Sequence, residues 1–112
     1  MSCLATIEGN VHRSDCVIGL MHSPQRFSEA FVREASDGGN WMDLSLAGHT
    51  HGGQILLGNK TFLTLNEFEK RYRSGWFTDI IPFLVSQGVG CESINWRLGS
   101  QAEVWLIELC CK

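Results

Sequence analysis

Three histidines stand where the sequence predicts that strands end. His22 follows an apolar run, and His49 and His51 lie in a glycine-rich stretch, residues 48–54, that follows a second predicted strand. Imidazole is the side chain that most often binds transition metals, and converging imidazoles suit Zn, Fe, Ni or Mn when carboxylates complete the ligand set. The types and spacing of these residues therefore predict a metal site.

The strands that carry His22 and His49 are predicted from hydrophobic patterning. Residues 16–21 form a compact apolar run typical of a fully buried strand, and residues 42–47 alternate as a half-buried strand does. A helical crossover between two strands places them parallel and side by side, or nearly so. Since ligands collect at the carboxyl ends of such strands, we expect His22 and His49 to reach a common point.

The connecting helix is predicted over residues 24–36. Ser23 is expected to cap it, and Pro24 to occupy its first turn, where the missing N–H of proline costs nothing. Glu29 and Arg33 are spaced four residues apart, an arrangement that favours an ion pair. An apolar stripe at helical spacing is expected to face the core. The stripe comprises Phe27, Ala30, Phe31 and Ala35.

Further elements follow along the chain. The sequence predicts a β-hairpin around residues 58–60, a short helix within residues 66–73, and strands over residues 82–86 and 103–109. This alternation of strands and helices predicts a single α/β or α+β layered domain over residues 1–112.

The stretch Gly48-His49-Thr50-His51-Gly52-Gly53-Gln54 carries the sharpest signal. Its two histidines share one face if the backbone is extended, and its glycines allow positive φ and a close approach of a ligand. An H-x-H pair alone is more typical of two partly exposed loop histidines than of a metal site. The third strand-end histidine, His22, favours a site.

Together with residues 43–47, this stretch resembles the last metal-binding motif of the calcineurin-like metallophosphoesterase family. The upstream residues Gly19-Leu20-Met21-His22-Ser23-Pro24 resemble the motif that precedes it, and residues 82–90 resemble the strand and glycine turn near the family's C-terminus. The resemblance covers about residues 16–109.

The resemblance implies an α/β fold, part of an α-β-β-α sandwich with mixed sheets and a crossover helix. It also implies an enzyme that hydrolyses phosphate esters with two divalent ions (Mn, Fe, Zn or Mg). Carried over residue by residue, His22 and His49 bind one ion and His51 binds the other. Two ions about 3.5–4 Å apart lower the pKa of a bridging water and clamp the phosphoryl oxygens.

The family's early motifs, D-x-H, G-D and G-N-H, are absent from this sequence. They supply the bridging aspartate, and three imidazoles alone do not hold two dications against their mutual repulsion. We therefore expect the 112 residues to represent the second half of a phosphoesterase domain, with an N-terminal half missing. Alone, the chain is expected to bind one divalent ion weakly and to turn over phosphate esters poorly or not at all.

One alternative remains open. The chain is also compatible with a degenerate phosphoesterase fold that serves as a non-catalytic binding scaffold. A cupin also carries H-x-H, but it requires a glutamate three or four residues later, where this sequence has Gln54 and Ile55.

Composition excludes several other classes. The sequence has 9 basic and 12 acidic residues without a clustered basic face, so a nucleic-acid-binding surface is not expected. No apolar run approaches the roughly 20 residues of a membrane helix, and no secretory signal is evident. The odd count of 5 cysteines favours free thiols in a reducing compartment, which predicts a cytoplasmic location.

Overall fold

The computed structural model describes residues 10–30, 34–79 and 81–110. The elements are β1 (Ile18–Met21), the 3-10 helix η1 (Pro24–Arg26), α2 (Phe27–Ala30), β2 (Leu44–Ala47), the 3-10 helix η2 (His51–Gly53), β3 (Leu56–Leu57), β4 (Lys60–Thr61), α3 (Glu67–Arg71), β5 (Gly75–Phe77) and β6 (Phe83–Val85).

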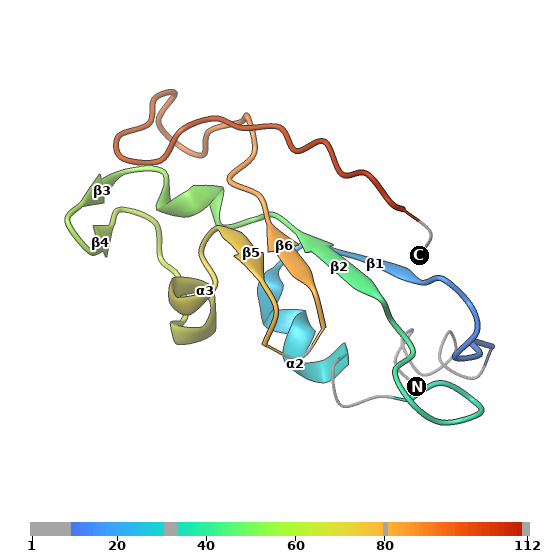
Figure 1. Cartoon of the computed structure of the whole chain (residues 1–112). Coiled ribbons are helices and arrows are strands. Elements are labelled where there is room, and N and C mark those ends of the chain that lie inside the picture. The colour runs from blue at the N-terminus through green and yellow to red at the C-terminus, as the bar shows by residue number, and fades with distance from the viewer. Residues whose placement is uncertain (1–9, 31–33, 80, 111–112) are drawn as a thin grey trace.

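The principal sheet has four strands in the order β1-β2-β6-β5 (Figure 1). Strands β1, β2 and β6 are parallel neighbours, and β5 joins β6 in the antiparallel sense. The fold is therefore mixed α/β, and the prediction that the first two strands are parallel neighbours is confirmed. The crossover between them passes through η1 and α2, as helical connections between parallel strands do.

The start of the crossover helix is confirmed. Ser23 has extended backbone angles and accepts a hydrogen bond from the Gln25 N–H at 3.2 Å, and Pro24 occupies the first helical position. The hydroxyl of Ser23 thus satisfies one of the donors that a helix start leaves without a partner. This cap fixes the direction in which the chain leaves β1.

The predicted end of that helix is wrong. Glu34 forms an isolated bridge with Asn40, so residues 34–36 are not helical. Here the backbone finds other partners, because the Ala35 N–H donates to the Gly39 carbonyl at 3.0 Å. Phe31, predicted for the apolar stripe, and Arg33, predicted to pair with Glu29, lie outside the described residues.

The burial of the first two strands differs from the prediction. Strand β1 is not fully buried, because it lies at an edge of the sheet, and Leu20 is 79% exposed. Strand β2 is more buried than an alternating strand, because it is central, and even Ser45 is inaccessible to solvent. Hydrophobic patterning located both strands but not their order in the sheet.

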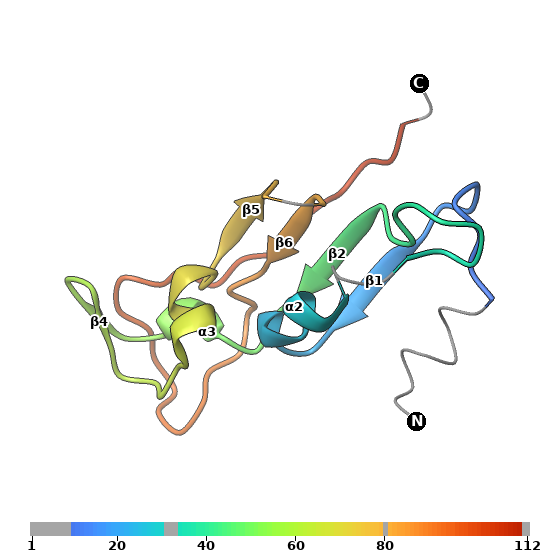
Figure 2. The same cartoon turned by 90° about the horizontal axis from the view of Figure 1, so that it is seen from below.

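The face of the sheet that carries α2 and α3 forms the core. Phe83 packs against Phe27 and Tyr72, with ring centroids 4.6 Å and 5.1 Å apart. Figure 2, seen from below, shows α2 in front of β1 and β2 on this face. The core residues of this cluster are Phe27, Ala47, Tyr72, Phe83 and Val85. This packing holds β2 and β6 at fixed positions beneath the loops that follow them.

Three smaller predictions are confirmed. The hairpin is β3–β4, the short helix is α3 with Asn66 as its cap, and the strand within residues 82–86 is β6. The described cysteines, Cys16, Cys91 and Cys110, are free.

The closing strand predicted over residues 103–109 is wrong. The described residues 101–110 belong to no strand, and the segment runs as an extended chain above the sheet in Figure 1. Val104 and Leu106 are 85% and 97% exposed. The alternating pattern suits a strand, but pairing needs the free edge of another strand, and none meets this segment within the described part of the chain. In that part, no helix has the length and apolar character needed to cross a membrane.

Candidate functional site

Three loops leave the sheet on the same side, at the carboxyl ends of β1, β2 and β6, because these strands run parallel. The first begins at His22, the second contains residues 48–54, and the third follows β6 with residues 86–91. Carboxyl ends of parallel strands are where ligands collect in layered α/β folds. The predicted histidines thus lie at the carboxyl ends of the strands, where a ligand-binding site is usually found.

The rings of His22 and His49 lie side by side, with centroids 4.5 Å apart and planes tilted by 52°. Their proximity follows from the strand register, in which Met21 pairs with Ala47. The pairing continues one step further, because the Gly48 N–H donates to the His22 carbonyl at 3.2 Å. Both side chains remain accessible, and that of His49 is 39% exposed. The sequence predicts that these two imidazoles reach a common point.

The backbone around them is strained. His49, His51 and Gln54 have φ values of 68°, 50° and 52°, in the left-handed region that side chains with a Cβ seldom adopt. Thr50, between the histidines, is fully buried, and its hydroxyl donates to the Arg73 carbonyl at 2.6 Å. Such conformations persist only where surrounding contacts enforce them, and they cluster at functional sites.

The ring of His51 is directed to the third loop. Its Nδ1 lies 3.2 Å from the carbonyl oxygen of Gly90. A carbonyl only accepts, so in the neutral ring Nδ1 carries the proton and Nε2 keeps its lone pair. This is the tautomer that leaves Nε2 available as a ligand.

Sequence reasoning missed Glu69, a buried carboxylate beside His49. Its Oε1 lies 3.7 Å from His49 Nε2 and accepts from the Ser23 hydroxyl at 2.8 Å. Its Oε2 accepts from the Asn66 N–H at 3.1 Å and completes a capping box at the start of α3. The signal was present in the sequence, because Asn66 and Glu69 have the spacing of that motif. Its proximity to a histidine 20 residues away depends on tertiary structure.

Gln54 was also missed as an organising residue. Its side chain is fully buried, where Nε2 donates to the carbonyls of Glu92 and Ile94 at 2.9 Å and 2.8 Å. Its Oε1 accepts from the Glu92 N–H at 2.7 Å. The amide of Gln54 therefore fixes the loop that contains Glu92 relative to the histidine stretch.

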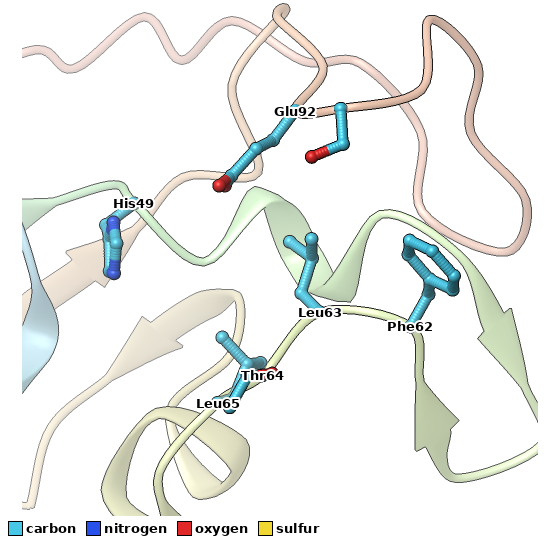
Figure 3. A pocket seen from close by; sticks show the side chains of 7 residues that line it. His49, Phe62, Leu63, Thr64, Leu65 and Glu92 are labelled. Carbon is cyan, nitrogen blue, oxygen red and sulfur yellow. The ribbon is translucent and has the colours of Figure 1, made fainter.

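That loop borders a cavity of about 290 Å³ beside His49. Figure 3 shows Glu92 on one side of the cavity, Phe62 and Leu63 on another, and His49 at its end. The lining residues are His49, Phe62, Leu63, Thr64, Leu65, Glu92 and Ser93. A ligand held at His49 has room to extend into this space.

As a metal site, the described residues are incomplete. Among residues 10–30, 34–79 and 81–110, no group of three or more His, Cys, Asp or Glu side chains lies close enough to hold an ion. The rings of His22 and His49 are in contact, and His51 is held separately through Gly90. The assignment of metal ligands therefore stays a prediction.

The chain is similar to a protein of Bacillus subtilis (strain 168) described as "Uncharacterized protein YpbG". The two are 29% identical over 94 residues, a match that covers 81% of this chain and 30% of the relative. The chain thus spans under a third of the length of the curated relative it matches. No protein-family model matches the chain, and no solved structure matches it.

Proposed function

We propose that this chain supplies the histidine half of a metal-dependent phosphoesterase, an enzyme that hydrolyses phosphate esters at a dinuclear metal centre. The observation that carries the proposal is the contact between the rings of His22 and His49, 4.5 Å apart, at the ends of adjacent parallel strands. The strained backbone of residues 49–54 supports it, because such strain accumulates at functional sites.

In this proposal, His22 and His49 hold one divalent ion and His51 holds a second. The ions, when bound, supply a nucleophilic water and neutralise charge on the phosphoryl group. The chain's own contribution is to orient the ligands. Neutral imidazoles leave the positive charge of the ions undiminished, which suits the negative charge that develops at phosphorus.

The remaining carboxylate ligands come, in this proposal, from polypeptide beyond this chain. An apolar surface supports that inference. Leu20 and Trp76, 79% and 47% exposed, stand at the two ends of a row across one face of the sheet, and between them Leu46 is half-buried and Leu84 is buried. This row, named the open face below, lies opposite the helices. Large apolar side chains exposed on one face mark a site of contact with other polypeptide, in this proposal a further layer of the same domain.

The test is metal binding by the 112-residue chain, measured by calorimetry with Mn²⁺ and Zn²⁺. We expect weak binding of one ion and, with Mn²⁺ present, no steady hydrolysis of p-nitrophenyl phosphate. His49→Gln should abolish binding, because it removes one of the two adjacent imidazoles. His12→Gln is the matched control, since His12 is exposed and hydrogen-bonds Ser36, and it should bind as the unaltered chain does.

A longer polypeptide that also carries D-x-H, G-D and G-N-H motifs should hydrolyse phosphate esters, and His49→Ala in it should abolish activity while leaving it folded. A scaffold without catalysis is the second candidate, favoured by the lack of a three-residue ligand group among the described residues. Absence of both metal binding and hydrolysis in the longer polypeptide would select the scaffold.

A further inference from the structure

The carbonyl group of His51 is held by several donors at once. It accepts from the Gln54 N–H at 2.9 Å and from Arg97 Nη1 at 3.0 Å. The hydroxyl of Ser100 lies 2.7 Å from the same oxygen. These contacts fix the peptide plane that follows His51. The φ of His51 is 50°, a conformation that persists only where surrounding contacts hold it.

The other arm of Arg97 reaches the third loop. Its Nη2 donates to the Gln87 carbonyl at 2.8 Å and to the Gly90 carbonyl. The Gly90 carbonyl is also the acceptor for Nδ1 of His51. One guanidinium therefore contacts both groups that determine where the His51 ring sits, namely its own backbone carbonyl and the acceptor of its ring N–H.

Arg97 is itself fixed by the chain around it. The next residue, Leu98, donates its N–H to the Gln54 carbonyl at 3.0 Å and accepts from the Leu56 N–H at 2.8 Å. Nη1 of Arg97 also lies 3.1 Å from the Ser100 hydroxyl. The segment that carries Arg97 is thus tied to the end of the histidine stretch, 46 residues away from His51 in sequence.

We propose that Arg97 is a positioning residue that holds His51 with Nδ1 protonated toward Gly90 and Nε2 free to bind a metal ion. The ligand role of His51 rests on the proposed function, but its orientation does not. An arginine suits this task because its planar fork presents five donors in fixed directions, whereas lysine presents a single ammonium. Partners that orient a ligating histidine typically change metal affinity by about 10–100-fold when they are removed.

The experiment measures the tautomer of His51 directly. The ¹⁵N-labelled 112-residue chain, freed of metal by a chelator, is studied by long-range ¹H–¹⁵N NMR of its imidazoles at alkaline pH, with His51→Gln used for assignment. We expect a single tautomer with the proton on Nδ1. Arg97→Lys should give a mixture of tautomers, because the charge is kept but the bridge between the His51 and Gly90 carbonyls is lost.

The matched control is Arg13→Lys. Arg13 is exposed and pairs with Asp37 at 3.7 Å, so the His51 spectrum should not change. A proton on Nε2 in the unaltered chain, or an unchanged tautomer in folded Arg97→Lys, overturns the proposal. If Arg97→Lys does not fold, Arg97→Gln takes its place, because it also removes the guanidinium that contacts the His51 and Gly90 carbonyls; an unchanged tautomer there also overturns the proposal.

Titration with Zn²⁺ separates this proposal from the proposed function. In the longer polypeptide, where the proposed function has a second ion at His51, Arg97→Lys should weaken binding of that second Zn²⁺ ion by about 10–100-fold. If the His51 tautomer depends on Arg97 but the longer polypeptide binds no metal, the positioning role is sustained and the metal site is refuted. If His51 binds metal and its tautomer does not depend on Arg97, only the positioning role is refuted.

Discussion

At the scale of single residues, Glu69 both caps the start of α3 and lies beside His49. Its carboxylate accepts hydrogen bonds from the Asn66 N–H and the Ser23 hydroxyl, and it lies 3.7 Å from His49. A carboxylate this well buried persists because hydrogen-bond donors surround it. Removing it leaves those donors without their acceptor.

We therefore expect Glu69→Ala to reduce the free energy of unfolding by about 1–3 kcal/mol, measured by urea denaturation. Glu67→Ala is the control two residues away, since the Glu67 side chain is 90% exposed and pairs with Lys70 on the surface. Its effect should stay within about 0.5 kcal/mol. Equal effects of the two substitutions would show that the capping box contributes nothing beyond a surface charge.

At the scale of elements, the turn at η2 brings three loops into contact. Gly52 has a φ of 62°, and a Cβ added there would lie 2.4 Å from side-chain atoms of Gln87 and Ser100. Gly58, in the turn of the β3–β4 hairpin, has a φ of 64° and nothing within 4 Å of the same position. The two glycines share a backbone conformation and differ in their surroundings.

Alanine substitutions at these two positions separate strain from crowding. Gly58→Ala should cost about 1–2 kcal/mol of unfolding free energy, the usual cost of a left-handed conformation with a Cβ. Gly52→Ala should cost about 1–3 kcal/mol more, because the contacts around His51 must also move. Thermal and urea denaturation measure both, and a Gly52→Ala chain no less stable than Gly58→Ala would contradict the close packing of these loops.

At the scale of the whole molecule, helices cover one face of the sheet, whereas on the other face residues 103–105 border Leu46 and Leu84 and leave Leu20 exposed. The open face includes Leu20 at a sheet edge, with 79% of its surface exposed. If a further layer of polypeptide covers this face, a charge at that position is tolerated in the 112-residue chain and buried in a longer polypeptide. Burial of an unpaired charge is costly.

Leu20→Glu should therefore change the stability of the 112-residue chain by no more than about 0.5 kcal/mol. In the longer polypeptide it should destabilise by more than about 2 kcal/mol, as measured by denaturation. Leu57→Glu is the control, since Leu57 is 71% exposed in the hairpin and away from the open face. A negligible effect of Leu20→Glu in both polypeptides would remove the support for a covering layer.

The C-terminal segment is tied to the site through Glu103. Its carboxylate accepts from the Gln87 N–H at 2.8 Å and from Trp105 Nε1 at 2.8 Å. Burial raises the pKa of Glu103, but these hydrogen bonds and that from the Gln87 side chain outweigh it, so the net pKa is lower than its ordinary value of 4.5. The ionised form is thus favoured in the folded chain.

This lowered pKa gives a pH dependence of stability. The contribution of Glu103 is fully present above its unfolded pKa and is lost as the pH falls through the lower folded pKa. We expect the unaltered chain to lose stability below about pH 4.5 more steeply than Glu103→Gln does, in urea denaturation at a series of pH values. Parallel pH profiles would show that the carboxylate is not held as described.

The sequence by itself determined the elements next to the histidines. The apolar run before His22, the cap at Ser23 and the capping box at Asn66 are local signals, because each depends on side chains within a few residues of one another. The adjacency of His22 and His49 was also predictable, since a helical crossover makes neighbouring strands parallel.

Only the tertiary structure decided which strands are central and which distant side chains hold the histidines. It also decided that residues 103–109 pair with no strand in the described part of the chain. Glu69 meets His49 across 20 residues, and Arg97 meets the His51 carbonyl across 46. Local patterning records the period of a segment and whether it is apolar, but the partner of a backbone or charged group depends on where the remaining chain lies.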